Sequence, residues 1–231
     1  MSSSAAEARA GARAVAPMLL GVIPFGLVAG AAPAAQGLPK WSASGFSSLM
    51  FAGASQLAAI DVLGHGGTAL VAILAAWTIN LRLVLYSASL APSVTDVSLA
   101  RRLGAAYLLV DQNYAVAITR WADDGGEPGD RRLAFLIGGG LLLWTCWQLS
   151  TAAGVLIGGA LPADTPLDFA LPLVFLVLLV PVLTNRASVA AAAAGGAAAV
   201  IAAQVGAGEA AIVVGCGFGI VAGYLTECLQ R

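Results

Sequence analysis

Charged residues are scarce in this chain. Only 10% of its 231 residues are Asp, Glu, Lys or Arg, against about 25% in soluble domains. The formal net charge is −1 and there is no basic block, which excludes nucleic acid as a partner. The three cysteines form no C-x-x-C pair, so neither a disulfide framework nor a zinc site is indicated.

Several catalytic and nucleotide-binding motifs are also missing. The sequence contains no G-x-x-x-x-G-K-[ST], which excludes an ATP site of that type on this chain. There is no G-x-S-x-G nucleophile elbow. The single histidine, His65, is too few for an H-E-x-x-H metalloprotease site. We therefore expect no enzymatic activity, no bound metal and no cofactor.

What the chain has in abundance is apolar sequence, since 59% of its residues are hydrophobic. Apolar runs of about 20 residues recur along nearly its whole length, and each is long enough to cross a bilayer core. The sequence predicts an all-α fold, a polytopic integral membrane helix bundle with about eight transmembrane segments. The segments lie near 15–35, 43–63, 67–90, 101–121, 133–160, 167–184, 187–204 and 209–227. Seven is the alternative, because the last two are short, rich in Ala and Gly, and compatible with one broken helix.

The same pattern predicts the domain organisation. Residues 1–14 are expected to be a disordered cytoplasmic N-terminus, and residues 15–228 a single transmembrane permease domain. The distribution of Arg and Lys between the loops favours a cytoplasmic N-terminus and a cytoplasmic C-terminus. Arg101 and Arg102 disagree with this orientation, because eight simple spans place them outside.

A weak internal similarity points to a possible internal repeat. Phe25-Gly-Leu-Val-Ala-Gly30 in the first span nearly recurs as Phe218-Gly-Ile-Val-Ala-Gly223 in the last. Many transporters consist of two structural repeats.

Arg82 is the most informative residue, because it stands with Asn80 well inside an apolar segment. An intramembrane Arg costs at least about 2.5 kcal/mol on insertion scales, so it needs a partner and usually marks a functional site. Its planar guanidinium fits a substrate carboxylate. The alternative is a structural ion pair with Asp61 or Asp111, and Asp111 is itself either a proton carrier or the counter-ion of Arg82.

A second polar interruption occurs at Phe51-Ala-Gly-Ala-Ser-Gln56. The small residues are typical of a helix-packing face. The alternative is a locally unwound helix in which Gly53, Ser55 and Gln56 bind a polar ligand, as in the discontinuous helices of transporters.

These elements together resemble the AzlC family, the large subunit of bacterial branched-chain amino-acid exporters. The resemblance rests on Leu20-Gly-Val-Ile-Pro-Phe-Gly26, Phe51–Gln56, Asn80-Leu-Arg82 with Tyr86-Ser87 behind it, and Asp111, all in family order. It covers roughly residues 15–225. In the family an acidic residue often follows the Asp, whereas this chain has Gln112 there, which weakens a proton relay.

The resemblance implies a gradient-driven permease of the bacterial plasma membrane that exports valine-like amino acids. It also implies a partner, a small AzlD-type membrane protein. The expected substrate-binding residues are Gly53, Ser55, Gln56, Asn80, Arg82 and Asp111. The alternatives are an exporter or channel for another small organic or amino acid, and a non-transporting assembly subunit of such a complex.

Overall fold

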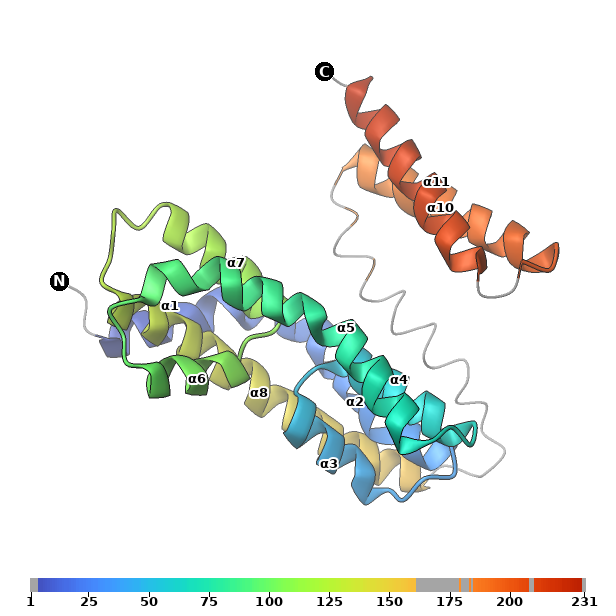
Figure 1. Cartoon of the computed structure of the whole chain (residues 1–231), viewed down its shortest axis with the longest axis horizontal. Helices are drawn as coiled ribbons and strands as arrows, with labels where there is room; N and C mark the ends of the chain where they lie inside the picture. The colour runs from blue at the N-terminus through green and yellow to red at the C-terminus, as the bar shows by residue number, and fades with distance from the viewer. Residues whose placement is uncertain (1–3, 161–178, 180–182, 184, 208–209, 230–231) are drawn as a thin grey trace. The chain divides into compact units, whose positions relative to one another are not determined.

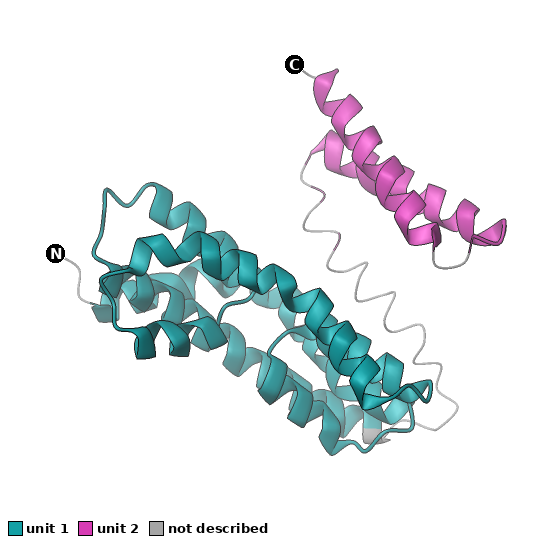
Figure 2. Ribbon diagram, viewed as in Figure 1, with its two compact units in different colours: residues 1–171 teal, residues 172–231 magenta. Residues whose placement is uncertain are grey.

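The computed structural model describes residues 4–160, 179, 183, 185–207 and 210–229, and the regular elements in these ranges are all helices. The chain divides into two compact units, Met1–Leu171 and Pro172–Arg231, which Figure 2 shows in different colours. Each unit is described by itself. The predicted span 167–184 lies outside the described residues except for Leu179 and Leu183.

Five helical stretches in the described ranges are long and apolar enough to cross a membrane. They are Ser4–Ala35, Ala69–Val94, Gly129–Gly158, Arg186–Gln204 and Ala210–Cys228. The all-α membrane fold predicted from composition is therefore confirmed. The count of eight spans is not confirmed, because the predicted segments 43–63 and 101–121 are each divided into two short helices.

The first unit is built along one long helix, α8 (Gly129–Ala160, 32 residues). Three consecutive elements lie against it, namely α1 (Ser4–Val15), the 3-10 turn η1 (Ala16–Met18) and α2 (Leu19–Ala35). They run parallel to α8, because Gly11 meets Phe135 while Gly30 meets Thr151 and Gly154 farther along. The absence of a side chain at these glycines lets the helix backbones touch.

The N-terminus differs from the sequence-based expectation. Residues 4–14, predicted to be disordered, belong to α1. The reason is that α1 has partners: Glu7 pairs with Arg120 (3.6 Å) and Val15 is fully buried in the core.

The segment expected to be the second span is a helical hairpin. Helix α3 (Trp41–Met50) ends at Phe51, whose φ of 36° is left-handed, and Ala52 is extended before α4 (Gly53–Gly64) begins. Gly64 lies against Gln36, which precedes α3, so α4 returns to the end of the unit from which α3 started. The local unwinding considered for Phe51–Gln56 is confirmed at Phe51 and Ala52.

The segment expected to be the fourth span is a second hairpin of the same kind. Helix α6 (Leu99–Tyr107) and α7 (Asp111–Ala122) are joined by three residues that end in the extended Val110. Arg101 at the start of α6 pairs with Asp130, and Asp124 after α7 pairs with Arg132. Both open ends of this hairpin therefore lie beside the beginning of α8.

The two hairpins enter the unit from opposite ends, and their tips meet near the middle of α8 (Figure 1). The rings of Phe51 and Tyr107 are 6.3 Å apart. The Tyr107 hydroxyl donates to the Ser48 carbonyl (2.5 Å) and accepts from the Trp144 indole (3.0 Å). Helix α5 (Ala69–Leu90), followed by the 3-10 turn η2 (Ala91–Val94), connects one hairpin to the other.

This topology changes the side of the membrane on which Arg101 and Arg102 are expected to lie. Arg101 and Arg102 lie at the end of the unit where α1 and α8 begin, on the same side as Arg120 and Arg132. We call this end the basic end. Because α6 and α7 form a hairpin and not one span, the two arginines are not on the opposite side.

The second unit contains two antiparallel helices, α10 (Arg186–Gln204) and α11 (Ala210–Cys228). Asn185 caps α10 through a capping box with Ser188. The helices pack at Gly195, Gly215 and Gly219, where backbones approach closely. The last two predicted segments are thus two separate helices. The Phe25–Gly30 and Phe218–Gly223 sequences lie in different units, so the proposed repeat stays a prediction.

Candidate functional site

An ion pair marks the place where α5 passes the tip of the second hairpin. Arg82, near the middle of α5, places its Nη1 atom 2.9 Å from Oδ2 of Asp111. The Arg82 side chain is 37% exposed and that of Asp111 is 41% exposed. The counter-ion alternative for Asp111 is therefore realised in this structure, and the Asp61 alternative is not, since Asp61 lies beside His65.

The backbone explains why an acid stands at position 111. Asp111 is the first residue of α7, and the preceding Val110 provides no side-chain cap. The N-terminus of a helix carries partial positive charge and free N–H groups, which favour a carboxylate in the first turn. The Asp111 carboxylate thus lies at the N-terminus of α7 and beside the Arg82 guanidinium.

The pair has unused hydrogen-bonding capacity. Two buried side-chain atoms of the pair, Arg82 Nε and Asp111 Oδ1, lack a hydrogen-bond partner within the described ranges. In native proteins such buried atoms usually bond to another protein group, to ordered water or to a ligand. One is a donor on a cation and the other an acceptor on an anion, so a ligand with both a carboxylate and an ammonium group matches them.

Asn80 does not share a face of α5 with Arg82. Two residues correspond to about 200° around an α-helix. The two side chains therefore leave α5 on different sides, and the role of Asn80 as a substrate contact stays a sequence-based prediction.

Aromatic hydroxyls extend the site along α5 and α7. The Tyr86 hydroxyl interacts with the Asp111 carboxyl group, and the Tyr86 ring stacks on Tyr114 with centroids 4.2 Å apart. The Tyr114 hydroxyl lies 3.2 Å from the Ser89 hydroxyl. Sequence reasoning missed Tyr114. The available signal was the spacing of Asp111 and Tyr114, which are three residues apart and therefore neighbours on one helix face.

The polar residues of the first hairpin are engaged elsewhere. Gln56 is fully buried and accepts from the Ser47 hydroxyl (3.1 Å). Its amide nitrogen donates to the carbonyls of Ala29 and Ala43 (3.4 Å each). Ser55 donates to the Ala52 carbonyl (2.9 Å). These side chains therefore tie the broken backbone to α2 and α3.

Gly53 also serves packing in this structure. A Cβ atom at this position would lie 2.6 Å from both the Phe25 ring and the Trp147 ring, which pack edge to face. Gly53, Ser55 and Gln56 are thus brought together around the first break, whereas Arg82 and Asp111 are brought together at the second.

Asn113 is the counterpart of Gln56 in the second hairpin, and sequence reasoning did not single it out. It is fully buried, and its amide donates to the carbonyls of Leu108 (3.2 Å) and Leu136 (2.9 Å). Each break is therefore followed within four residues by a buried amide that binds backbone carbonyls. The available signal was the run Asp111-Gln112-Asn113, of which at least one residue had to face the interior.

The ionisable residues form no evident metal centre. Within the described ranges, no group of three or more His, Cys, Asp or Glu residues is placed to hold a metal ion. The site therefore offers one cation, one anion and neutral hydrogen-bonding groups.

Comparisons with known proteins agree with this architecture. The family described as "AzlC protein" matches residues 17–161, more than half of the chain. An uncharacterized membrane protein of Archaeoglobus fulgidus is 32% identical over 174 residues, which cover 74% of this chain and 73% of the relative. The inner membrane protein YgaZ of Escherichia coli is 26% identical over 219 residues, or 92% of this chain and 84% of the relative. No solved structure matches.

Proposed function

Because the chain belongs to the AzlC family of membrane proteins, we propose that it is a permease subunit that exports branched-chain, valine-like amino acids across the plasma membrane. The observation that carries this proposal is the Arg82–Asp111 pair at the tip of a broken helix, with an unpaired donor and an unpaired acceptor. Binding sites of this kind, at discontinuous helices near the middle of the membrane, are typical of secondary transporters.

The chemistry of the pair suits a zwitterion. The substrate carboxylate engages the Arg82 guanidinium, whose planar donor fork matches it. The substrate ammonium engages the Asp111 carboxylate, which has a free oxygen. Each charge of the ion pair thus exchanges its internal partner for one end of the substrate, so no charge is left unpaired when the substrate binds.

The two hairpins suit an alternating-access cycle driven by a gradient. One hairpin closes the site from the basic end and the other from the opposite end, and their tips touch through Tyr107 and Ser48. Withdrawal of one tip at a time opens the site to one side. The absence of a Walker-type ATP motif in the sequence agrees with a gradient as the energy source.

The charge distribution supports a cytoplasmic location for the basic end. In the first unit the arginines at that end or on α1 are Arg9, Arg13, Arg101, Arg102, Arg120, Arg131 and Arg132, whereas the connections at the opposite end carry only Lys40. Basic residues are retained on the cytoplasmic side. The N-terminus is then cytoplasmic, and a cytoplasmic C-terminus stays a sequence-based prediction.

A small AzlD-type membrane protein is the proposed partner. The support is the family membership together with the surface of α11, where the exposed large apolar side chains Ile212, Val213, Phe218 and Ile220 are available to another helix or to lipid. Co-expression with a tagged partner should raise the purified yield of this chain. Equal yield and equal thermal stability without the partner would argue against a two-subunit complex.

Transport in proteoliposomes tests the function. Vesicles containing this chain, with and without the partner, are loaded with labelled valine, and efflux is measured against a range of unlabelled amino acids. We expect saturable efflux that leucine and isoleucine inhibit and glutamate does not. Efflux that rises linearly with concentration, or that no branched-chain amino acid inhibits, contradicts the proposal.

Arg82→Lys connects this function to the site. A lysine keeps the charge but not the bidentate fork, and a charge-assisted hydrogen bond is worth about 1.5–3 kcal/mol, or roughly ten- to a hundred-fold in affinity. Apparent affinity should fall by that factor while membrane abundance is unchanged. Thr78→Val, one turn away and with a hydroxyl bonded only to the Leu74 carbonyl, is the matched control. If the Arg82→Lys variant has the affinity of the wild type, Arg82 does not bind the substrate.

A further inference from the structure

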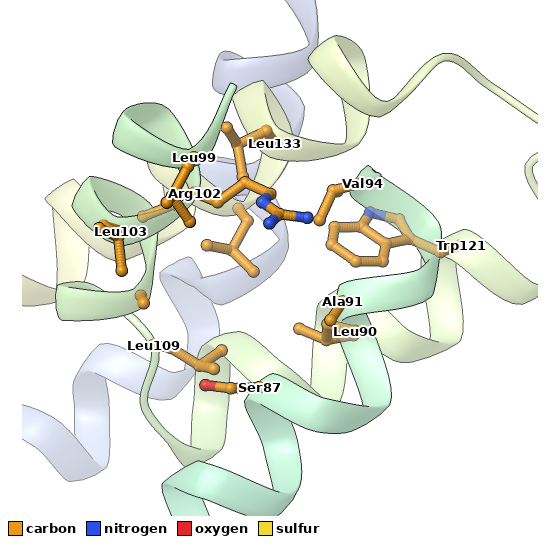
Figure 3. A pocket seen from close by; sticks show the side chains of 13 residues that line it. Ser87, Leu90, Ala91, Val94, Leu99, Arg102, Leu103, Leu109, Trp121 and Leu133 are labelled. Atoms are coloured by element: carbon orange, nitrogen blue, oxygen red, sulfur yellow. The ribbon is translucent and has the colours of Figure 1, made fainter. Parts of the chain in front are cut away.

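Figure 3 shows a cavity whose lining includes neither Arg82 nor Asp111. It has a volume of about 210 Å³ and is enclosed by the end of α5, η2, α6, the end of α7 and the beginning of α8. Its walls are almost entirely apolar, and Trp121, Leu133 and Leu136 in them are nearly fully buried. The cavity therefore suits a hydrocarbon group and not a polar solute.

One cation stands over this cavity. Arg102 reaches across the pocket toward Val94 and Trp121 (Figure 3). Its guanidinium makes no ion pair or hydrogen bond with any residue that the structure describes. The neighbouring arginines are all paired: Arg101 with Asp130, Arg120 with Glu7, Arg131 with Glu127 and Arg132 with Asp124.

A second polar group at the cavity also lacks a partner. Trp121 is 7% exposed, and its buried indole Nε1–H has no acceptor among the residues that the structure describes. A buried indole N–H usually finds an acceptor. An unpaired guanidinium and an unpaired N–H beside one apolar cavity both call for an anionic oxygen group attached to a hydrocarbon chain.

The exposed residues that line the cavity favour a ligand from the lipid bilayer. Leu99 and Leu103 line it from α6 and are 61% and 62% exposed. These apolar side chains suit contact with acyl chains, while Arg102 on the same short helix suits the headgroup region. Basic pockets between helices at the cytoplasmic side bind anionic lipid headgroups.

We propose that this cavity is a binding site for an anionic phospholipid of the adjacent leaflet, with the phosphate on Arg102 and the first part of one acyl chain in the pocket. An amino-acid substrate fits it poorly, because the lining contains no carboxylate to pair with an ammonium group. The proposal does not depend on the transported substrate.

Lipid retention and thermal stability test the site. The purified full-length chain is exposed to phosphatidylglycerol, to phosphatidylcholine with the same acyl chains, and to inorganic phosphate. Bound lipids are counted by native mass spectrometry. We expect preferential retention of phosphatidylglycerol and a rise in Tm with that lipid alone. Equal stabilisation by phosphatidylcholine, or stabilisation by inorganic phosphate alone, overturns the proposal.

Matched variants locate the site. Arg102→Gln should weaken phosphatidylglycerol binding about tenfold, the loss expected for one charge-assisted contact. Arg101→Gln makes the same charge change one residue away, outside the pocket, and should retain the lipid. Ala106→Phe fills the cavity from an exposed position and should displace the acyl chain while Arg102 stays in place. Equal loss in both arginine variants indicates general electrostatic attraction and overturns the specific site, as does full binding by Ala106→Phe.

Discussion

Arg82 and Asp111 neutralise each other in a part of the chain where few other charges are available. A buried or half-buried ion pair is weak evidence for stability, because the cost of desolvation offsets much of the attraction. Removal of one partner has a larger effect, since the other charge is left without a counter-ion. Single and double substitutions therefore separate a structural role of the pair from a substrate-binding role.

Neutralising the pair provides the first prediction. Arg82→Gln and Asp111→Asn should each lower the amount of folded protein in the membrane, and the double variant should recover most of it. If both residues bind the substrate as proposed, export should stay abolished in the double variant. The measurements are membrane abundance and valine efflux for the three variants. Restored efflux in the double variant would show that the pair is structural only.

The contacts of Gln56 predict a structural role for this residue, whereas its position in the sequence also allowed a ligand contact. Its position in Phe51–Gln56 suggested a ligand contact, but its amide has three protein partners and no exposure. Gln56→Leu should therefore lower thermal stability, because each buried polar group left unpaired costs about 1–3 kcal/mol. Thr78→Val is the control. Unchanged stability with abolished export would assign Gln56 to the substrate.

Asp124 provides a pH-dependent prediction at the basic end. The Arg132 guanidinium, with the N–H groups of Gly126 and Glu127, lowers the pKa of the Asp124 carboxyl from 3.8 to about 2. A carboxyl with a lowered folded-state pKa stabilises the fold above its unfolded pKa, and this contribution is lost as the pH falls from about 4 to 2. The contribution is about 2 kcal/mol.

The test compares two neighbouring acids. Asp124→Asn should reduce stability at neutral pH and flatten its decline between about pH 4 and pH 2. The matched control is Asp123→Asn, since Asp123 is exposed. Denaturation of the purified protein across this pH range measures both variants. An identical acid profile in wild type and Asp124→Asn would refute the assignment.

At the scale of elements, glycines decide how closely the helices approach. A Cβ at Gly30 on α2 would lie 2.9 Å from the Gly154 Cα atom of α8, whereas one at Gly104 on α6 would have no neighbour within 4 Å. Gly30→Ala should therefore cost about 1–3 kcal/mol through overpacking. Gly104→Ala should be neutral or stabilising by up to about 1 kcal/mol, because Ala is the better helix former. Thermal unfolding in detergent distinguishes them; equal effects would contradict the close packing of α2 on α8.

The sequence predicted the helices well but not their direction. Residues 43–63 and 101–121 are long enough for one span each, and hydropathy does not reveal whether a chain crosses or returns. No proline marks either break: the reversal depends on a left-handed Phe51 and on extended Ala52 and Val110. These conformations are held by tertiary contacts.

The sequence also predicted only part of the candidate site. The cost of an isolated charge in an apolar segment identified Arg82 and offered Asp111 as its partner, and the structure places the two in contact. For Gln56 the sequence left packing and ligand binding open, and the folded arrangement brings the carbonyls of Ala29 and Ala43 within reach of its amide. Whether a buried amide can bind a ligand depends on hydrogen-bond partners that are far from it in the sequence.

At the scale of the whole molecule, two returning hairpins make a prediction about sidedness. In a background in which Cys146, Cys216 and Cys228 are replaced by Ala, single cysteines at Thr95 and Asp123 flank the hairpin of α6 and α7. A membrane-impermeant thiol reagent should modify both from the same side. Cysteines at Lys40 and His65 flank the other hairpin and should both react from the opposite side. If the cysteines at Thr95 and Asp123 react from different sides of the membrane, α6 and α7 together cross the membrane once and do not form a hairpin.

The unequal charge of the two hairpins also has a consequence for biosynthesis. Of Asp, Glu, Lys and Arg, residues 36–68, which include α3 and α4, contain only Lys40 and Asp61, whereas arginines surround α6 and α7. With the basic end inside, the ribosome delivers both hairpins on the cytoplasmic face, but only the first must be carried across the bilayer before it folds back. Because the first hairpin has few charged side chains, the free energy needed to move it through the bilayer is small. We therefore expect the second hairpin to dock against α8 late in assembly, after α8 has been inserted.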